Sequence, residues 1–233
     1  MGWRDLGCYG SSFYETPNID RLAADGMLFT DAYAACPVCS PTRASIITGK
    51  TPATVGVTNF IGGDAKGKLL DAPYLHQLPL EEISIASALR DAGYRTWHIG
   101  KWHLGQEPFY PLHHGFDVNV GGCHLGHPPS YFSPYRIENL ADGPDGEYLT
   151  DRLTDEAIAL IEQDDDKPFF LNLWHYAVHT PIQSPPAFFA RARNQWQSQR
   201  HPRNFHLGQR WVGDGGRFAD LERAAQRRQR LDV

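Results

Sequence analysis

The strongest constraint on the fold is an alternation of helix-like and strand-like segments that recurs three times within the first 180 residues. In the first repeat, residues 17–25 form the expected helix, with Pro17 in its first turn and Gly26 as its stop. Residues 27–33 follow as an expected strand, because apolar and aromatic side chains dominate this run.

The second and third repeats have the same order. A helix over residues 83–91 stops at Gly93 and precedes a strand over 94–99. A helix over 154–163 precedes the run 169–174, which is apolar enough to predict a strand buried on both faces. The alternation predicts an α/β fold with a largely parallel sheet, in which ligands bind beyond the carboxyl ends of the strands.

The segment after the first expected strand carries a cysteine at the start of a helix. Ser40 is the expected N-cap, Pro41 suits the first helical position, and Gly49 ends the helix. A helix N-terminus favours a bound anion, and Arg43, one turn further on, adds a cation suited to a tetrahedral oxyanion. The sequence therefore predicts an anion site around Cys39.

Other interpretations of Cys36 and Cys39 are a redox pair or half of a zinc site. The chain has four cysteines but no second pair at similar spacing, which disfavours structural zinc. A thioredoxin-like pair would need a different order of elements. Four cysteines in a chain of 233 residues do not indicate a disulfide framework either.

The two later strand ends also carry polar side chains. Gly100 breaks the second strand and presents Lys101 and His103 at its carboxyl end, and His179 follows the third strand. Taken alone, each of these is more often a solvated lysine or a structural histidine. The three segments together are far more specific than any one of them.

Together they resemble the type I, formylglycine-dependent, arylsulfatase-like sulfatases of the alkaline-phosphatase superfamily. Cys39 to Arg43 with Thr48-Gly49 is similar to the Cys-x-Pro-x-Arg…Thr-Gly signature of that family. Gly93 to Gly105 is similar to its second signature, and His179-Thr180-Pro181 to its downstream histidine element. The resemblance covers residues 1–186 and implies an alkaline-phosphatase-like core.

The resemblance implies hydrolysis of sulfate esters. Cys39 would be oxidised to Cα-formylglycine by a formylglycine-generating enzyme, and Arg43 would stabilise its hydrated form. Lys101 and His179 would bind the sulfate oxygens, with His179 as a candidate proton donor to the leaving alcohol. His103 would assist collapse of the intermediate. A divalent metal, usually calcium, would polarise the sulfate.

The resemblance also implies the class of substrate. A small sulfate ester or a sulfated glycan would bind, and His124 lies in the stretch where the family contacts its substrate. Two alternatives stay open: a catalytically inactive remnant that binds sulfated glycans, and a phosphatase or phosphonate hydrolase of the same superfamily.

The sequence departs from the family at both ends. The family's first strand, which ends in two metal-ligating aspartates, has no counterpart before Met1, and its later Asp-Asn pair has none after Pro186. Of the usual protein ligands to the metal, only Cys39 is present. We therefore expect a truncated catalytic domain over 1–186 that is inactive on its own.

Residues 187–233 hold ten arginines and four acidic residues, a net charge of +6, which leaves −11 for the rest of the chain. We interpret this stretch as a basic tail unlike the family, with a helix over 218–225. A nucleic-acid partner for the tail is the least favoured alternative. No apolar run approaches the ~20 residues that a membrane span needs, and no signal peptide is visible, so the sequence does not indicate a localisation.

Overall fold

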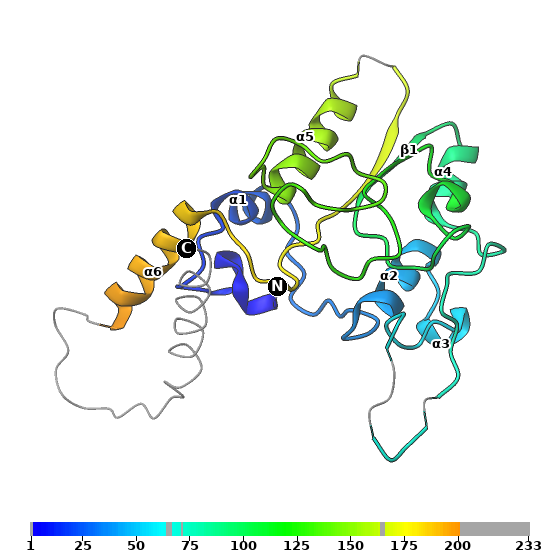
Figure 1. Cartoon of the computed structure of the whole chain (residues 1–233), viewed down its shortest axis with the longest axis horizontal. Coiled ribbons are helices and arrows are strands. Elements are labelled where there is room, and N and C mark those ends of the chain that lie inside the picture. The colour runs from blue at the N-terminus through cyan, green and yellow to red at the C-terminus, as the bar shows by residue number, and fades with distance from the viewer. Residues whose placement is uncertain (1, 64–66, 71, 164–165, 201–233) are drawn as a thin grey trace. The chain divides into compact units, whose positions relative to one another are not determined.

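The computed structural model describes residues 2–63, 67–70, 72–163 and 166–200 (Figure 1). The chain forms two compact units, Met1–Arg191 and Ala192–Val233, and the sheet and the candidate site belong to the first. The expected division at residues 186 and 187 stays a prediction. The expected helix over 218–225 lies outside the described residues.

The elements follow one another in this order: η1 (Trp3–Asp5), η2 (Gly7–Tyr9), α1 (Pro17–Asp25), α2 (Cys39–Thr48), α3 (Pro52–Val55), α4 (Ile85–Asp91), β1 (Arg95–Gly100), η3 (Pro111–His114), β2 (Val118–Val120), α5 (Leu149–Ile161), β3 (Phe169–Trp174) and α6 (Pro186–Arg200). None of the helices in the described part of the chain is both long and apolar enough to span a bilayer.

The sheet has three strands in the order β2-β1-β3, and both pairings are parallel. The predicted α/β fold with a parallel sheet is therefore confirmed. In the register, His98 of β1 lies opposite Asn172 of β3, and Gly100 lies opposite Trp174. The short strand β2 was not expected, because three residues carry too little periodicity to be recognised.

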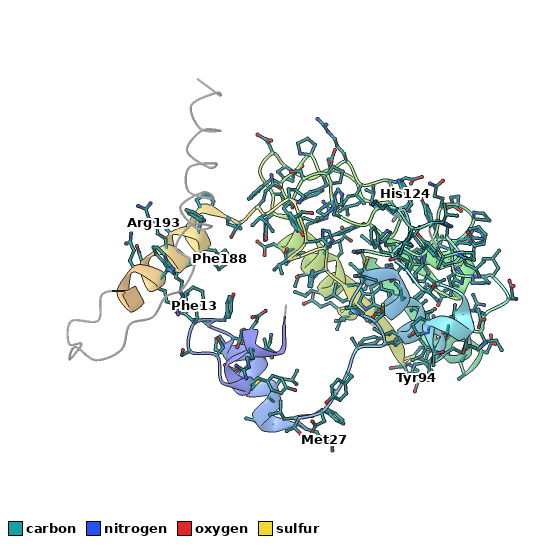
Figure 2. The ribbon with its side chains drawn as sticks, turned by 90° about the horizontal axis from the view of Figure 1, so that it is seen from below. Phe13, Met27, Tyr94, His124, Phe188 and Arg193 are labelled. Atoms are coloured by element: carbon teal, nitrogen blue, oxygen red, sulfur yellow. The ribbon has the colours of Figure 1, made fainter. Side chains whose placement is uncertain are left out.

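Two expectations about strands are wrong. Residues 27–33 form no strand, and Met27, labelled in Figure 2, and Phe29 are 78% and 63% exposed. A strand exists only when its backbone pairs with another, and within the described residues nothing pairs with this run. The strand β3 is not buried on both faces, because only Asn172 in it is buried and Phe169 is largely exposed.

Helices lie on opposite sides of β1 (Figure 1). The helix α5 carries the buried Leu149, Leu153 and Ala157 and contacts β1 on one side, whereas α4 contacts it on the other. The helix α4 is capped by Ser84, whose hydroxyl accepts from the backbone N–H of Ser87 at 2.9 Å. This layering places the carboxyl end of β1 next to α2.

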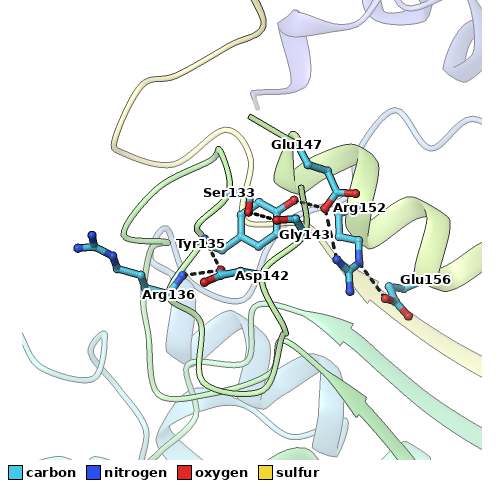
Figure 3. Close-up of polar contacts among 8 residues, drawn as sticks. All are labelled: Ser133, Tyr135, Arg136, Asp142, Gly143, Glu147, Arg152 and Glu156. Carbon is cyan, nitrogen blue, oxygen red and sulfur yellow. Dashed lines mark hydrogen bonds and ion pairs between the residues drawn. The ribbon is translucent and has the colours of Figure 1, made fainter. Parts of the chain in front are cut away.

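A long connection between β2 and α5 packs beside the sheet and is held by polar contacts (Figure 3). The guanidinium of Arg152 pairs with Glu147 at 3.3 Å and with Glu156 at 2.8 Å. The Tyr135 hydroxyl donates to Glu147 at 2.6 Å, and Asp142 accepts from the backbone N–H of Tyr135 at 2.6 Å. These contacts order the connection whose first residues reach the candidate site.

Candidate active site

Cys39 is the first residue of α2, so the predicted place at a helix N-terminus is confirmed. The predicted N-cap is wrong: Val38 takes that position, and Ser40 lies inside the helix. The Ser40 hydroxyl instead donates to the carbonyl of His103 at 3.0 Å and accepts from the N–H of Ile61 at 3.1 Å. It therefore ties three segments together rather than capping one.

Both ends of α2 are anchored. Gly49 ends the helix at φ +69°, as predicted, and its N–H donates to the carbonyl of Ser45 at 2.8 Å. Before the helix, the Thr42 hydroxyl donates to the carbonyl of Cys36 at 2.6 Å and accepts from its N–H at 3.0 Å. All four cysteines are free, so Cys36 and Cys39 do not form a disulfide here.

Lys101 follows the end of β1 and is buried, with 3% of its surface exposed. Its N–H donates to the carbonyl of Trp174 at 2.7 Å. Burial and, to a smaller extent, the charge of Arg43 lower the pKa of its ammonium group to about 8, against an opposing interaction with Cys39. The side chain of Lys101 is therefore directed at Cys39.

His103 also lies beside the Cys39 thiol. Its Nδ1 is 3.3 Å from Cys39 Sγ, and its Nε2 is 2.9 Å from the carbonyl oxygen of Ile61. Since a carbonyl only accepts, Nε2 carries the proton and Nδ1 is the acceptor toward Cys39. Burial and, to a smaller extent, the charge of Lys101 lower the pKa of His103 to about 4, so the ring is neutral at pH 7.

Arg43 packs beneath the same cluster. Its Nη1 donates to the carbonyl of Lys101 at 2.8 Å, and its guanidinium lies 4.6 Å from the ring centre of Trp174. Burial lowers its pKa to about 10, opposed by attraction to Cys39. Its Nε is buried and has no hydrogen-bond partner in the described part of the chain.

His179 is exposed and lies close enough to this cluster for its charges to act on the ring. Its pKa is lowered first by partial burial and then by the charges of Lys101, His127 and His103. The rings of His179 and His127 are stacked, with centroids 5.7 Å apart and an interplanar angle of 16°. No individual role was predicted for His127, although it lies in the same stretch as His124, where the resemblance implies contact with substrate.

The predicted substrate residue His124 contacts a different set of side chains. Its Nδ1 lies 3.1 Å from the Tyr110 hydroxyl, which donates to Glu138 at 2.7 Å. The side chain is 43% exposed, and Figure 2 shows it at the surface. The loop that carries it reaches the site through Cys123, whose carbonyl accepts from the N–H of His103 at 3.0 Å.

The arrangement is suited to an anion. The cationic side chains of Arg43 and Lys101 lie beside Cys39, and the charge of Arg43 lowers the pKa of Lys101. Within the described residues, the groups that shift the pKa values of Arg43, Lys101 and His103 include no carboxylate. Two neighbouring cations at a helix N-terminus, with no carboxylate among the groups that shift their pKa values in the described part of the chain, favour binding of a tetrahedral oxyanion.

The described part of the chain contains no set of side chains that could bind the expected calcium ion. Among residues 2–63, 67–70, 72–163 and 166–200, no group of three or more histidine, cysteine, aspartate or glutamate side chains could hold a metal. Hard cations such as calcium require several oxygen ligands, and the cluster around Cys39 presents cations instead. No catalytic step is therefore assigned to a metal here.

Comparison with known proteins gives a consistent picture. The family model "Sulfatase" matches residues 1–229. The N-acetylgalactosamine-6-sulfatase of Sus scrofa is 38% identical over 217 residues, which is 83% of this chain and 40% of that protein. Human arylsulfatase G is 38% identical over 70% of this chain and 30% of its own length. The chain thus spans less than half the length of these relatives.

Solved structures are similar as well. Ps i-CgsB in complex with k-i-k-neocarrahexaose superposes with a TM-score of 0.68 at 30% identity, over 83% of this chain and 46% of that one. A second protein, solved with its substrate D-glucosamine-2-N,6-O-disulfate, has a TM-score of 0.64 at 29% identity, over 82% of this chain and 35% of that one. These neighbours have the alkaline-phosphatase-like sulfatase fold. This chain forms a part of that fold.

Proposed function

Because the chain belongs to the sulfatase family, we propose that the cluster at the carboxyl ends of β1 and β3 binds and hydrolyses sulfate esters. The observation that carries the proposal is the convergence on Cys39 of groups from separate segments. The acceptor nitrogen of His103 lies 3.3 Å from its sulfur, and the ammonium group of Lys101 lies close enough to Cys39 for Cys39 to raise its pKa.

The two buried cations are the proposed sulfate-binding groups. Arg43 and Lys101 would neutralise the charge of a sulfate ester, and their burial makes this attraction stronger than it would be in water. A bound anion would in turn raise the pKa of Lys101 and of His179 toward their usual ranges. A larger share of His179 would then be protonated and able to donate to the leaving alcohol.

Cys39 is the proposed precursor of the nucleophile. Conversion of its side chain to the aldehyde of formylglycine is a two-electron oxidation in which the Cβ–S bond breaks, the sulfur leaves as hydrogen sulfide and water supplies the carbonyl oxygen; a formylglycine-generating enzyme would pass the two electrons to an external oxidant. The hydrated aldehyde supplies two hydroxyl groups, of which one attacks sulfur and the other later loses its proton to release sulfate. His103 is neutral and directs Nδ1 at residue 39, so it is placed to accept that proton.

A sulfated sugar is the proposed substrate. The relatives named above include an N-acetylgalactosamine-6-sulfatase, and two structural neighbours were solved with sugars. His127, stacked on His179, and His124, held by Tyr110, are the proposed contacts to the sugar around the sulfate. Both histidines are exposed and therefore accessible to a large ligand.

The test is binding of inorganic sulfate to the 233-residue chain, measured by isothermal titration calorimetry. Lys101→Ala and Arg43→Ala should each weaken binding by about tenfold or more, since each removes a charged contact. Phosphate, titrated in parallel, tests the phosphatase alternative. Unchanged sulfate affinity in both variants, or clearly tighter binding of phosphate, would contradict the proposal.

Hydrolysis requires its own control. After co-production with a formylglycine-generating enzyme, any turnover of an aryl sulfate should vanish in Cys39→Ala. Cys8→Ala is the matched control, because Cys8 is also a free, partly buried cysteine and contributes nothing to this cluster. Turnover that survives in Cys39→Ala would remove this residue from the mechanism.

A further inference from the structure

His98 is a histidine in an apolar part of the core. Its side chain is fully buried, and its ring meets the edges of Trp102, Phe116 and Trp174 at centroid distances of 5.1, 5.4 and 5.8 Å. Burial lowers its pKa to about 3, so the ring is neutral. A neutral imidazole has one donor and one acceptor nitrogen, and in such surroundings both need a partner.

Both ring nitrogens have one, and the partners determine the tautomer. Nε2 lies 3.1 Å from the carbonyl oxygen of Gly100, which only accepts, so Nε2 carries the proton. Nδ1 therefore accepts, and Nδ2 of Asn172 lies 2.9 Å away as its donor. Asn172 lies directly opposite His98 in the pairing of β1 with β3 and is the one buried residue of β3.

The Gly100 carbonyl, which accepts from His98, and the Lys101 N–H belong to the same peptide group. The N–H of that same peptide group donates to the carbonyl of Trp174 at 2.7 Å. Gly100 has φ +97°, and a Cβ on it would lie 2.1 Å from that Trp174 oxygen. On the far side, the carbonyl of Lys101 accepts from Arg43 at 2.8 Å. The backbone around Lys101 is thus held on both sides.

We propose that His98 and Asn172 are positioning residues, whose hydrogen-bonded pair holds the Gly100 carbonyl and so directs Lys101 at the anion bound beside Cys39. Neither residue contacts the ligand; they act through the strand end. The inference rests on the proposed function, because Lys101 is an anion-binding group only there. The positioning role would explain the presence of a polar pair in a core where apolar side chains of similar volume would also fit.

Two variants test the pair, and a third is the matched control. Asn172→Leu removes the amide donor at similar volume, and His98→Leu removes both bonds of the ring. Thr96→Val is the control: Thr96 is buried on the same face of β1, and its hydroxyl donates to the carbonyl of Gly115 at 2.8 Å. It lies toward the other end of the strand from Lys101.

The readouts are the Kd for inorganic sulfate and the thermal unfolding of the full chain. Asn172→Leu and His98→Leu should raise Kd by roughly tenfold, because displacing a binding group by about 1 Å can cost up to ~100-fold. Thr96→Val should lower the melting temperature and leave Kd unchanged. A positioning role is overturned if the pair variants keep the wild-type Kd, or if Thr96→Val raises it equally.

Lys101→Ala separates this inference from the proposed function. If Lys101→Ala abolishes sulfate binding while Asn172→Leu does not alter it, the positioning role alone is wrong. If the wild-type chain does not bind sulfate, the proposed function fails and the inference with it. Should the pair variants not fold, ¹⁵N NMR of wild-type His98 decides: a proton on Nε2 alone is expected, and a proton on Nδ1 overturns the proposal.

Discussion

Replacing Lys101 with methionine should stabilise the protein at neutral pH while abolishing sulfate binding. The pKa of the buried ammonium group is lowered from 10.5 to about 8. The charged form of Lys101 is therefore less favourable in the folded state than in the unfolded state. Methionine has similar length and no charge, and it also relieves the repulsion of Arg43. Under the proposed function, the Lys101 side chain serves binding at a cost in stability.

The size of the effect follows from the shift in pKa. A lowering from 10.5 to about 8 corresponds to about 3 kcal/mol at pH 7, where Lys101 is charged in both states. As the pH rises above 8, the folded state loses this proton before the unfolded state does, and the penalty declines. At pH 9.5 it should be about 1.4 kcal/mol, and it should nearly vanish above 10.5.

The assay is unfolding of wild type and Lys101→Met at pH 7 and pH 9.5. At pH 7 the variant should melt roughly 6 to 12 °C higher, and at pH 9.5 the gain should be about halved. Lys50→Met is the control, because Lys50 is an exposed partner of Glu82, and its loss should change stability by less than about 1 kcal/mol at either pH. A Lys101→Met protein that is less stable at pH 7, or whose gain does not shrink with pH, would refute the reasoning.

Three further predictions follow from the same geometry. Peptide mass spectrometry after exposure to a formylglycine-generating enzyme should show the thiol-to-aldehyde mass loss at Cys39 and not at Cys36; the reverse would contradict the assignment. His127→Asn should weaken binding of N-acetylgalactosamine 6-sulfate about tenfold without altering the Kd for inorganic sulfate, while His113→Asn, a surface histidine paired with a glutamate, should change neither. Gly100→Ala should cost about 4 kcal/mol or more, because its φ of +97° and the backbone oxygen 2.1 Å from a Cβ leave no room for the methyl group; a chemical denaturation midpoint close to wild type would show that the strand end can relax.

Much of this site could be predicted from the sequence because its signals are local. Proline and glycine marked the limits of α1 and the end of α2, and short-range periodicity identified β1 and β3. In a parallel sheet the carboxyl ends of neighbouring strands meet at one edge. For Cys39 the rule was applied through an expected strand over 27–33 that does not form, so its place near Lys101, 62 positions further along the chain, comes from the contacts of α2 with the residues after β1.

Other features depended on which segments the fold brings into contact. Residues 27–33 have the composition of a strand, but a strand requires a pairing partner, and composition does not supply one. Ser40 has the right position for an N-cap, but its hydroxyl bonds to His103 and Ile61 instead. The stacking of His127 on His179 joins two loops that no local pattern connects.

The sequence by itself determined the order of the elements and the residue types at the strand ends, because backbone propensity and side-chain periodicity act over a few neighbouring residues. Only the tertiary structure decided the protonation of the site. Lys101 and His98 are ordinary titratable groups in an unfolded chain, and their pKa values fall because packing removes water from them. Burial is a property of the assembled core, and the bond from Asn172 that gives His98 its tautomer spans 74 residues of sequence.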